Sequence, residues 1–259
     1  MLIRHKALEL GNGIIAFTTT RNGGVSIDEK YKSLNLGTYT NDRIEYIIEN
    51  KRRLCDELSI SERSMYNAHQ IHGDKIIDIN NEIVSMTDDE KRSKLDGCDA
   101  MITNIKGICI TVTTADCVPV LIYEKNNHVA AAIHSGWRGT LKNIAEKTIT
   151  KMKDKYDCSV HDMKAVIGPC ISGKNYQIGN DIKDIFTSAD KEYGKFFIND
   201  KNKGKSRMEI RRIVEFQLKS CGIKDIDVSK HCTFEEENLF FSARRQGNDS
   251  GRMLTGIII

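Results

Sequence analysis

Three side chains in this sequence are of types that bind transition metals, and each lies near the end of a predicted strand. They are His72 in HQIHG (69–73), Cys117 in TADCVPVLIY (114–123) and His134 in AAIHSGWRG (131–139). Imidazole and thiolate are ligands that Zn²⁺ prefers, and three protein ligands leave one position open, as in catalytic zinc sites. Copper also accepts two histidines and a cysteine, but no methionine lies beside these residues in sequence to serve as an axial ligand.

Local strand pairing predicts that two of these side chains lie close together. The apolar runs 118–123 and 128–133 are separated by a polar turn, which predicts an antiparallel hairpin. Pairing across this hairpin brings Cys117 within one or two residues of His134. The spacing does not show how His72 reaches them. A single histidine or cysteine is more often a buried structural residue, so these residue types alone do not establish that a metal site is present.

Four arginines are candidates for binding an anion: Arg138, Arg244, Arg245 and Arg252. Arg138 follows Trp137 in a glycine-flanked loop, and the other three surround the segment 247–251. Guanidinium groups bind phosphate or carboxylate through two parallel hydrogen bonds. A solvated basic loop explains the three C-terminal arginines equally well.

Asp116 directly precedes Cys117, and in a regular strand the two side chains point to opposite faces. A buried carboxylate needs a partner. We therefore expect Asp116 to accept a hydrogen bond from a ligating histidine or to pair with an arginine.

The elements that position these residues alternate between strands and helices. Apolar runs predict strands at 13–20, 75–79, 108–114, 118–123, 128–133, 225–229 and 253–259. Helical spacing predicts helices at 42–58, 140–156, 179–188 and 206–220. We expect Asn41 or Asp42 to cap the first helix and Gly222 to end the last. No repeat or linker divides the chain, so residues 1–259 are expected to form a single α+β domain.

Composition indicates a soluble cytoplasmic protein. A chain of 259 residues buries a core without disulfides, and its eight cysteines form no CxxC pair, which fits a reduced compartment. The N-terminus lacks a signal-peptide pattern, and Asp116 and Pro119 interrupt the most apolar stretch. The net charge is only +3, from 39 basic and 36 acidic residues. We therefore expect no nucleic acid or membrane as a partner.

Nine segments, spread in order over nearly the whole chain, resemble the YfiH/laccase-domain family. Older descriptions call this family multicopper polyphenol oxidase or laccase, and newer ones purine nucleoside phosphorylase. The segments are FTTTRNGGVS (17–26), SLNLG (33–37), ENKRRL (49–54), HQIHG (69–73), DGCDAMITN (96–104), TADCVPVLIY (114–123), AAIHSGWRG (131–139), IGPCISGKNYQIG (167–179) and FFSARRQGNDSGRM (240–253). The resemblance implies a layered α/β/β/α fold with mixed sheets, similar to the cytotoxic necrotizing factor catalytic domain.

The resemblance also implies a zinc ion held by His72, Cys117 and His134, and a catalytic role for these residues with Arg138. It implies phosphorolysis of adenosine, inosine, guanosine or methylthioadenosine to the free base and ribose 1-phosphate, with deamination of adenosine. Partners would be purine nucleosides and phosphate, on a monomer or weak homo-oligomer. The residues expected to contact substrate are Asn35, Arg53, Asp116, Arg245 and Arg252. Trp137 and Tyr176 could stack on a purine, although core packing is commoner for such rings.

Three alternatives stay open at this point. Cys117 activated by His134 could act as the nucleophile of a hydrolase or deamidase. Copper-dependent polyphenol oxidation would need several copper ions, for which seven histidines are few. A non-catalytic protein with a structural zinc ion would need a fourth ligand, such as His69.

Overall fold

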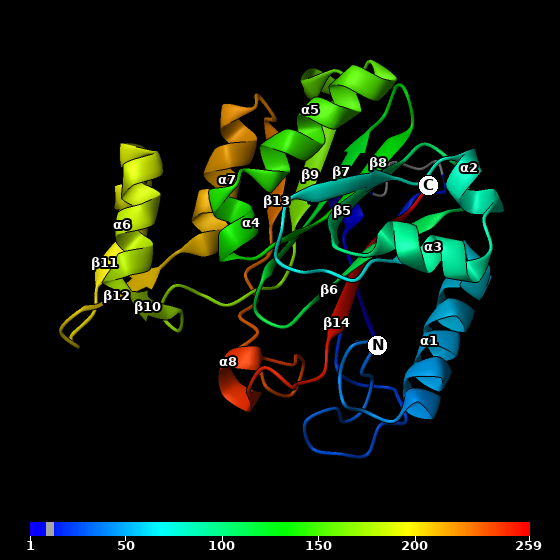
Figure 1. Ribbon diagram of the computed structural model, residues 1–259, viewed down its shortest axis with the longest axis horizontal. Helices are drawn as coiled ribbons and strands as arrows, with labels where there is room; N and C mark the ends of the chain where they lie inside the picture. The colour runs from blue at the N-terminus through cyan, green and yellow to red at the C-terminus, as the bar shows by residue number, and fades with distance from the viewer. Residues whose placement is uncertain (9–12) are drawn as a thin grey trace.

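The computed structural model describes residues 1–8 and 13–259, which form three β-sheets with helices packed against them (Figure 1). The five-stranded sheet has the order β1 (Leu2–Arg4), β2 (Ile15–Thr19), β14 (Met253–Ile258), β6 (Cys109–Thr114), β3 (Met65–Asn67). The six-stranded sheet has the order β13 (Asp225–Val228), β9 (Met163–Ile167), β7 (Val118–Glu124), β8 (Val129–Ser135), β5 (Cys98–Thr103), β4 (Lys75–Asp78). The three-stranded sheet has the order β10 (Gln177–Gly179), β12 (Lys205–Met208), β11 (Phe197–Asn199).

The helices connect these strands and cover the sheets. The α-helices are α1 (Ile44–Leu58), α2 (Asn81–Ser85), α3 (Asp88–Leu95), α4 (Trp137–Leu141), α5 (Ile144–Tyr156), α6 (Asn180–Ala189), α7 (Ile210–Ser220) and α8 (Ala243–Gln246). Short 3₁₀ turns are η1 (Lys6–Leu8), η2 (Glu62–Ser64), η3 (Val160–Asp162) and η4 (Lys191–Phe196). None of the helices in the described part of the chain is long and apolar enough to cross a membrane.

The two large sheets pack face to face between helices. Helix α1 packs on one face of the five-stranded sheet, where Leu54 lies in a cluster with Phe17 of β2. The other face meets the six-stranded sheet through a cluster that includes Ile110 of β6 and Leu121 of β7. The outer face of the six-stranded sheet, including Val120, packs against α5 and α7 (Figure 1). Since apolar residues cover both faces of β7 and β8, every residue of these two strands is buried.

The predicted hairpin is confirmed. Strands β7 and β8 pair antiparallel, with Val118 opposite Ser135 and Pro119 opposite His134. The strands predicted near 13–20, 75–79, 108–114, 225–229 and 253–259 are present as β2, β4, β6, β13 and β14, and helices 42–58 and 179–188 as α1 and α6. The mixed α and β class of the fold is therefore confirmed.

The predicted cap of the first helix is wrong. The N-cap residue of α1 is Arg43, and no side chain caps the helix. Asp42 accepts hydrogen bonds from Ser26 Oγ at 2.7 Å and from Asn35 Nδ2 at 3.0 Å instead. Its carboxylate thus connects the N-terminal loops.

Two predicted helices are shorter than expected. Residues 140–156 form the end of α4 and then α5, because Asn143 between them adopts a left-handed conformation with φ of 58°. The first residues of 206–220 belong to β12, which pairs with β10 and β11, and α7 begins only at Ile210. The end of α7 agrees with the prediction, since Gly222 follows it with φ of 98°.

Candidate metal centre and pocket

The chain crosses between the two large sheets twice beside the predicted metal site, and each crossing carries one candidate ligand. His72 lies between β3 of the five-stranded sheet and β4 of the six-stranded sheet, and Cys117 lies between β6 and β7. His134 is the penultimate residue of β8. The ligand atoms of these three residues lie within 4.8 Å of one another. His72 is exposed, Cys117 half-buried and His134 buried, so the cluster opens toward solvent on one side.

The backbone beside the cluster has an unusual conformation at two positions and leaves no room for a side chain at a third. His72 has φ of 60° and Asp116 has φ of 89°, values that few residues other than glycine adopt. At Gly136, an added Cβ would lie 2.8 Å from His72 Cδ2 and 3.2 Å from Cys117 Sγ. Glycine is therefore needed at this position for the three ligands to approach one another.

Asp99 of β5 is the carboxylate that supports the cluster, and it is not among the site residues predicted from the sequence. Its side chain is fully buried. Oδ1 accepts hydrogen bonds from His134 Nδ1 at 2.7 Å and from the His72 amide at 3.0 Å. Oδ2 accepts from the Gly73 amide at 2.7 Å and the Ile71 amide at 3.2 Å. The available signal was an aspartate within the otherwise apolar strand CDAMIT, which requires a buried partner.

The hydrogen bond that His134 donates to Asp99 determines which nitrogen of His134 is free. Nδ1 carries the proton shared with the carboxylate, so Nε2 is left to bind a metal or accept a proton. Burial opposes ionisation of Asp99, but His134 and the surrounding amides outweigh this effect and hold the pKa of the carboxyl below its usual value.

Electrostatics favour an ionised pair of Cys117 and His134. Burial opposes ionisation of the Cys117 thiol, but the charge and hydrogen bond of His134, aided by His72, lower its pKa to about 6. Burial also disfavours protonated His134, whereas the Cys117 thiolate and Asp99 raise its pKa to about 9. The thiolate is the form of cysteine that binds metals and attacks electrophiles.

The cluster lies in a pocket of about 570 Å³, within the size range of small-molecule sites. Its lining includes Arg138, Arg244, Arg252, Trp137 and Tyr176. The Arg138 guanidinium lies 4.3 Å from the Trp137 ring, and that of Arg244 lies 5.3 Å from the Tyr176 ring. Trp137 and Tyr176 therefore line the pocket and also pack against the core.

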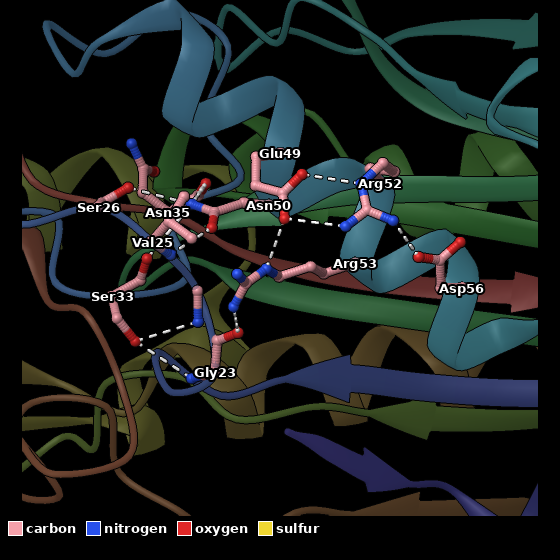
Figure 2. A network of polar contacts seen from close by, with 11 residues as sticks. Gly23, Val25, Ser26, Ser33, Asn35, Glu49, Asn50, Arg52, Arg53 and Asp56 are labelled. Atoms are coloured by element: carbon pink, nitrogen blue, oxygen red, sulfur yellow. Dashed lines mark hydrogen bonds and ion pairs between the residues drawn. The ribbon is translucent and has the colours of Figure 1, made fainter.

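The five predicted substrate contacts differ in whether they line the pocket and in what they are hydrogen-bonded to. Arg252 lines the pocket, although Nη1 and Nη2 also donate hydrogen bonds to carbonyl oxygens of residues 248–251. Asn35 is fully buried below the pocket lining, and Oδ1 accepts hydrogen bonds from the amides of Gly37 and Arg252. Arg53 lies on α1, outside the pocket lining, and donates hydrogen bonds to Glu49 and the Gly23 carbonyl (Figure 2).

The other two predicted substrate contacts, Asp116 and Arg245, form hydrogen bonds within the protein. Asp116 lines the pocket but accepts hydrogen bonds from Thr233 Oγ1 at 2.6 Å, Ser242 Oγ at 2.9 Å and the Arg244 amide at 2.7 Å. The expectation that Asp116 pairs with a ligating histidine or an arginine side chain is therefore wrong, since the positive φ of Asp116 turns it toward the C-terminal segment, where hydroxyls and a backbone amide are its donors. Arg245 lies outside the lining and donates hydrogen bonds to three backbone carbonyls.

His69 is not part of the ligand cluster. Its Nδ1 lies 2.7 Å from Asp96 Oδ1, and its ring stacks on Tyr39 with 3.9 Å between centroids. Among the described residues, the three ligands form the one group of this kind that could hold a metal ion. The residues present fit a metal, since two imidazoles and a low-pKa thiol converge and Asp99 directs one imidazole.

The chain is similar over nearly its whole length to known proteins. The family model described as multi-copper polyphenol oxidoreductase laccase matches residues 15–259. A purine nucleoside phosphorylase of Bacteroides thetaiotaomicron is 32% identical over 260 residues, which cover 100% of this chain and 96% of that protein. Adenosine deaminase RL5, from an unknown prokaryotic organism, is 30% identical over 247 residues, covering 95% of this chain and 94% of that protein.

A solved structure has the same fold. The Bacillus licheniformis hypothetical protein YfiH matches with a TM-score of 0.89 and 28% identity, over 97% of this chain and 95% of that one. The family model covers nearly the whole chain, and so do the relatives in sequence and structure. The chain therefore belongs to the multi-copper polyphenol oxidoreductase laccase family, the YfiH/laccase-domain family that its sequence resembles.

Proposed function

We propose that this protein is a zinc-dependent purine nucleoside phosphorylase that also deaminates adenosine. The observation that carries the proposal is the convergence of His72, Cys117 and His134 in a pocket that also contains three arginines. Relatives that align over nearly the whole chain are named purine nucleoside phosphorylase and adenosine deaminase, which supports this choice of substrate.

The pocket supplies groups for each part of a nucleoside and for phosphate. The rings of Trp137 and Tyr176 offer faces for a purine. Arg138 is exposed and forms no ion pair with a carboxylate in the described part of the chain, so it is available to bind phosphate. Burial raises the pKa of Tyr176, so its hydroxyl is protonated at neutral pH and can donate a hydrogen bond to substrate.

The ligand set favours zinc over copper, because cysteine and histidine with one open position form a common catalytic zinc site. His134 Nε2, Cys117 Sγ and His72 would hold the ion. When bound, zinc would supply Lewis acidity to an oxygen of the substrate or of water. Asp99 keeps His134 in the required tautomer throughout.

Arg138 and the residues expected to contact substrate divide into three groups under this proposal. Arg138 and Arg252 contact the substrate directly, since both line the pocket. Asn35, Asp116 and Arg245 act by positioning the segments that carry the arginines. Arg53 stabilises α1 against the N-terminal loop through Glu49 and Gly23.

The experiment is to purify the chain without added metal, quantify zinc and copper by mass spectrometry, and incubate it with adenosine or inosine. We expect zinc at about one ion per chain. We expect free base and ribose 1-phosphate only when phosphate is present, and ammonia from adenosine without it. Cys117→Ala removes zinc and both activities. Cys221→Ala, at a half-buried cysteine outside the pocket, leaves both unchanged. Full activity of zinc-free protein or of Cys117→Ala would contradict the proposal.

A second function is favoured by the arrangement of Cys117, His134 and Asp99. A thiolate beside an imidazolium that is oriented by a carboxylate is also the machinery of cysteine hydrolases and deamidases. The two functions differ in their response to a chelator. Chelation stops the zinc enzyme and added zinc restores it, whereas a cysteine hydrolase keeps its activity with chelator and loses it to iodoacetamide.

Copper-dependent polyphenol oxidation is the alternative that the family's description suggests. The single group of three metal-binding side chains within residues 1–8 and 13–259 favours one metal ion over the several that this chemistry needs.

We further propose that residues 1–259 form one domain, similar to the cytotoxic necrotizing factor catalytic domain. The protein is proposed to work in the cytoplasm as a monomer or weak homo-oligomer.

A further inference from the structure

A second hollow, of about 470 Å³, adjoins the pocket that contains the ligand cluster. It lies between α1, β3 and α3, and its floor is apolar, with Leu36, Met65 and Leu254 among the lining residues. Four residues line both hollows: Thr38, Tyr39, Asn67 and His69. The two hollows are therefore neighbours that share one wall.

The rim of the second hollow is basic. It contains four cations, Lys51, Arg63, Lys91 and Arg92, and two carboxylates, Glu62 and Asp88. Lys51, Arg63 and Lys91 form no ion pair with a carboxylate within the described residues, whereas Arg92 lies 3.5 Å from Asp89. The cations outnumber the carboxylates, so the rim attracts anions. This attraction is stronger than it would be in open solvent, because the apolar floor excludes water.

The shared wall presents an aromatic pair to solvent. The side chain of Tyr39 is 62% exposed, although its ring stacks on His69 at 3.9 Å and 31°. His69 is held in place by Asp96. An exposed, pre-positioned ring pair of this kind is a surface on which a flat or sugar-phosphate group can lie. His69 and the candidate ligand His72 are three residues apart, which limits their Cα separation to about 11 Å.

Lys91 is the best placed of the cations. It is half-buried on α3, and its Nζ lies 5.7 Å from the centre of the Tyr66 ring. Lys51 on α1 lines the opposite side of the same hollow. Both lysines are fixed on helices, so the positive charge does not depend on a mobile loop.

We propose that the two hollows form one continuous site for a purine nucleoside that carries a 5′-diphosphate. The nucleoside lies at the ligand cluster, and its phosphates extend past Tyr39 and His69 to Lys51 and Lys91. This inference rests on the proposed nucleoside specificity of the first pocket, and it extends the substrate class from nucleosides to nucleotides.

The experiment measures binding of adenosine, ADP and pyrophosphate to the full chain by calorimetry at fixed salt. We expect ADP to bind at least about tenfold more tightly than adenosine or pyrophosphate, because charge-assisted hydrogen bonds add to nucleoside binding. Lys51→Ala/Lys91→Ala reduces ADP affinity to that of adenosine and leaves adenosine affinity and turnover unchanged. The control Lys153→Ala/Lys224→Ala removes two exposed lysines outside both hollows and keeps the preference for ADP.

Three results overturn the inference: equal affinity for ADP and adenosine in the unaltered protein, an undiminished preference in Lys51→Ala/Lys91→Ala, or pyrophosphate affinity equal to that of ADP. Thermal melting of each variant verifies folding, and Lys51→Gln/Lys91→Gln repeats the test with longer polar side chains. Failure of the proposed nucleoside chemistry gives a different pattern. In that case neither the unaltered protein nor any variant turns over adenosine, while ADP binding still depends on Lys51 and Lys91.

Discussion

Asp99 joins two of the three candidate ligands through one carboxylate. Its oxygens accept hydrogen bonds from His134 Nδ1 and from the amides of residues 71–73, whose bent backbone includes the positive φ of His72. Successive amides of a bent backbone form a concave site for an anion. The ring of one ligand and the backbone of another are therefore set by the same buried group.

This arrangement predicts that Asp99→Asn weakens zinc binding by about 10–100-fold, the usual cost of losing a carboxylate behind a ligating histidine. An asparagine has one acceptor oxygen, and its NH₂ group would face amides that also donate. The measurement is zinc affinity by competition with a chromophoric chelator. Asp96→Asn is the matched control, because Asp96 has the same contact with His69 outside the cluster. Equal zinc affinity of the Asp99→Asn and Asp96→Asn proteins would show that Asp99 has no special role.

At the scale of elements, local sequence patterns predicted seven strands, β7 and β8 among them, but missed others such as β5 and β12 and did not predict the connections between sheets. The β7–β8 hairpin was predictable, since its two apolar runs are adjacent in sequence. The approach of His72 was not, because it depends on the parallel pairing of β3 with β6 and on the crossing from β3 to β4. Neighbouring residues do not encode such pairings.

The direction of Asp116 was unpredictable for a related reason. An alternating strand would have turned it away from Cys117, but the chain leaves β6 before Asp116 and crosses to the other sheet with a positive φ. Its partners Thr233 and Ser242 lie more than a hundred positions later in the sequence. The crossing therefore joins the metal site to the C-terminal segment that carries Arg244 and Arg252.

We predict that Asp116→Ala destabilises the protein by about 3 kcal/mol, because three donors, two of them buried hydroxyls, lose their acceptor. Loosening of the segment that carries Arg244 and Arg252 should also raise KM for the nucleoside more than it lowers kcat. Urea unfolding and steady-state kinetics measure the two effects. Asp227→Ala, at an exposed position on β13, should change the free energy of unfolding by less than about 0.5 kcal/mol. An equal loss of stability in the two variants would contradict the role given to Asp116.

At the scale of the whole molecule, the candidate site lies where the chain passes from the five-stranded sheet to the six-stranded sheet. His72 and Cys117 lie on the two crossings, and His134 lies at the end of a central strand of the six-stranded sheet. The sheets already share an apolar cluster that includes Ile110 and Leu121. A metal ion at the edge of that interface would add a second connection between the same two layers.

Zinc should therefore stabilise the whole fold, because the three ligands converge only when both crossings are in place. At free zinc about 1,000-fold above Kd, binding contributes about 4 kcal/mol, which for a chain of this size raises Tm by about 8 °C. His72→Ala removes the ligand supplied by the first crossing and should abolish most of this shift, whereas Cys221→Ala should retain it. Scanning calorimetry of each protein with chelator and with buffered zinc measures the difference. An undiminished zinc-dependent shift in His72→Ala would place the stabilising ion at another site and separate zinc binding from the contact between the sheets.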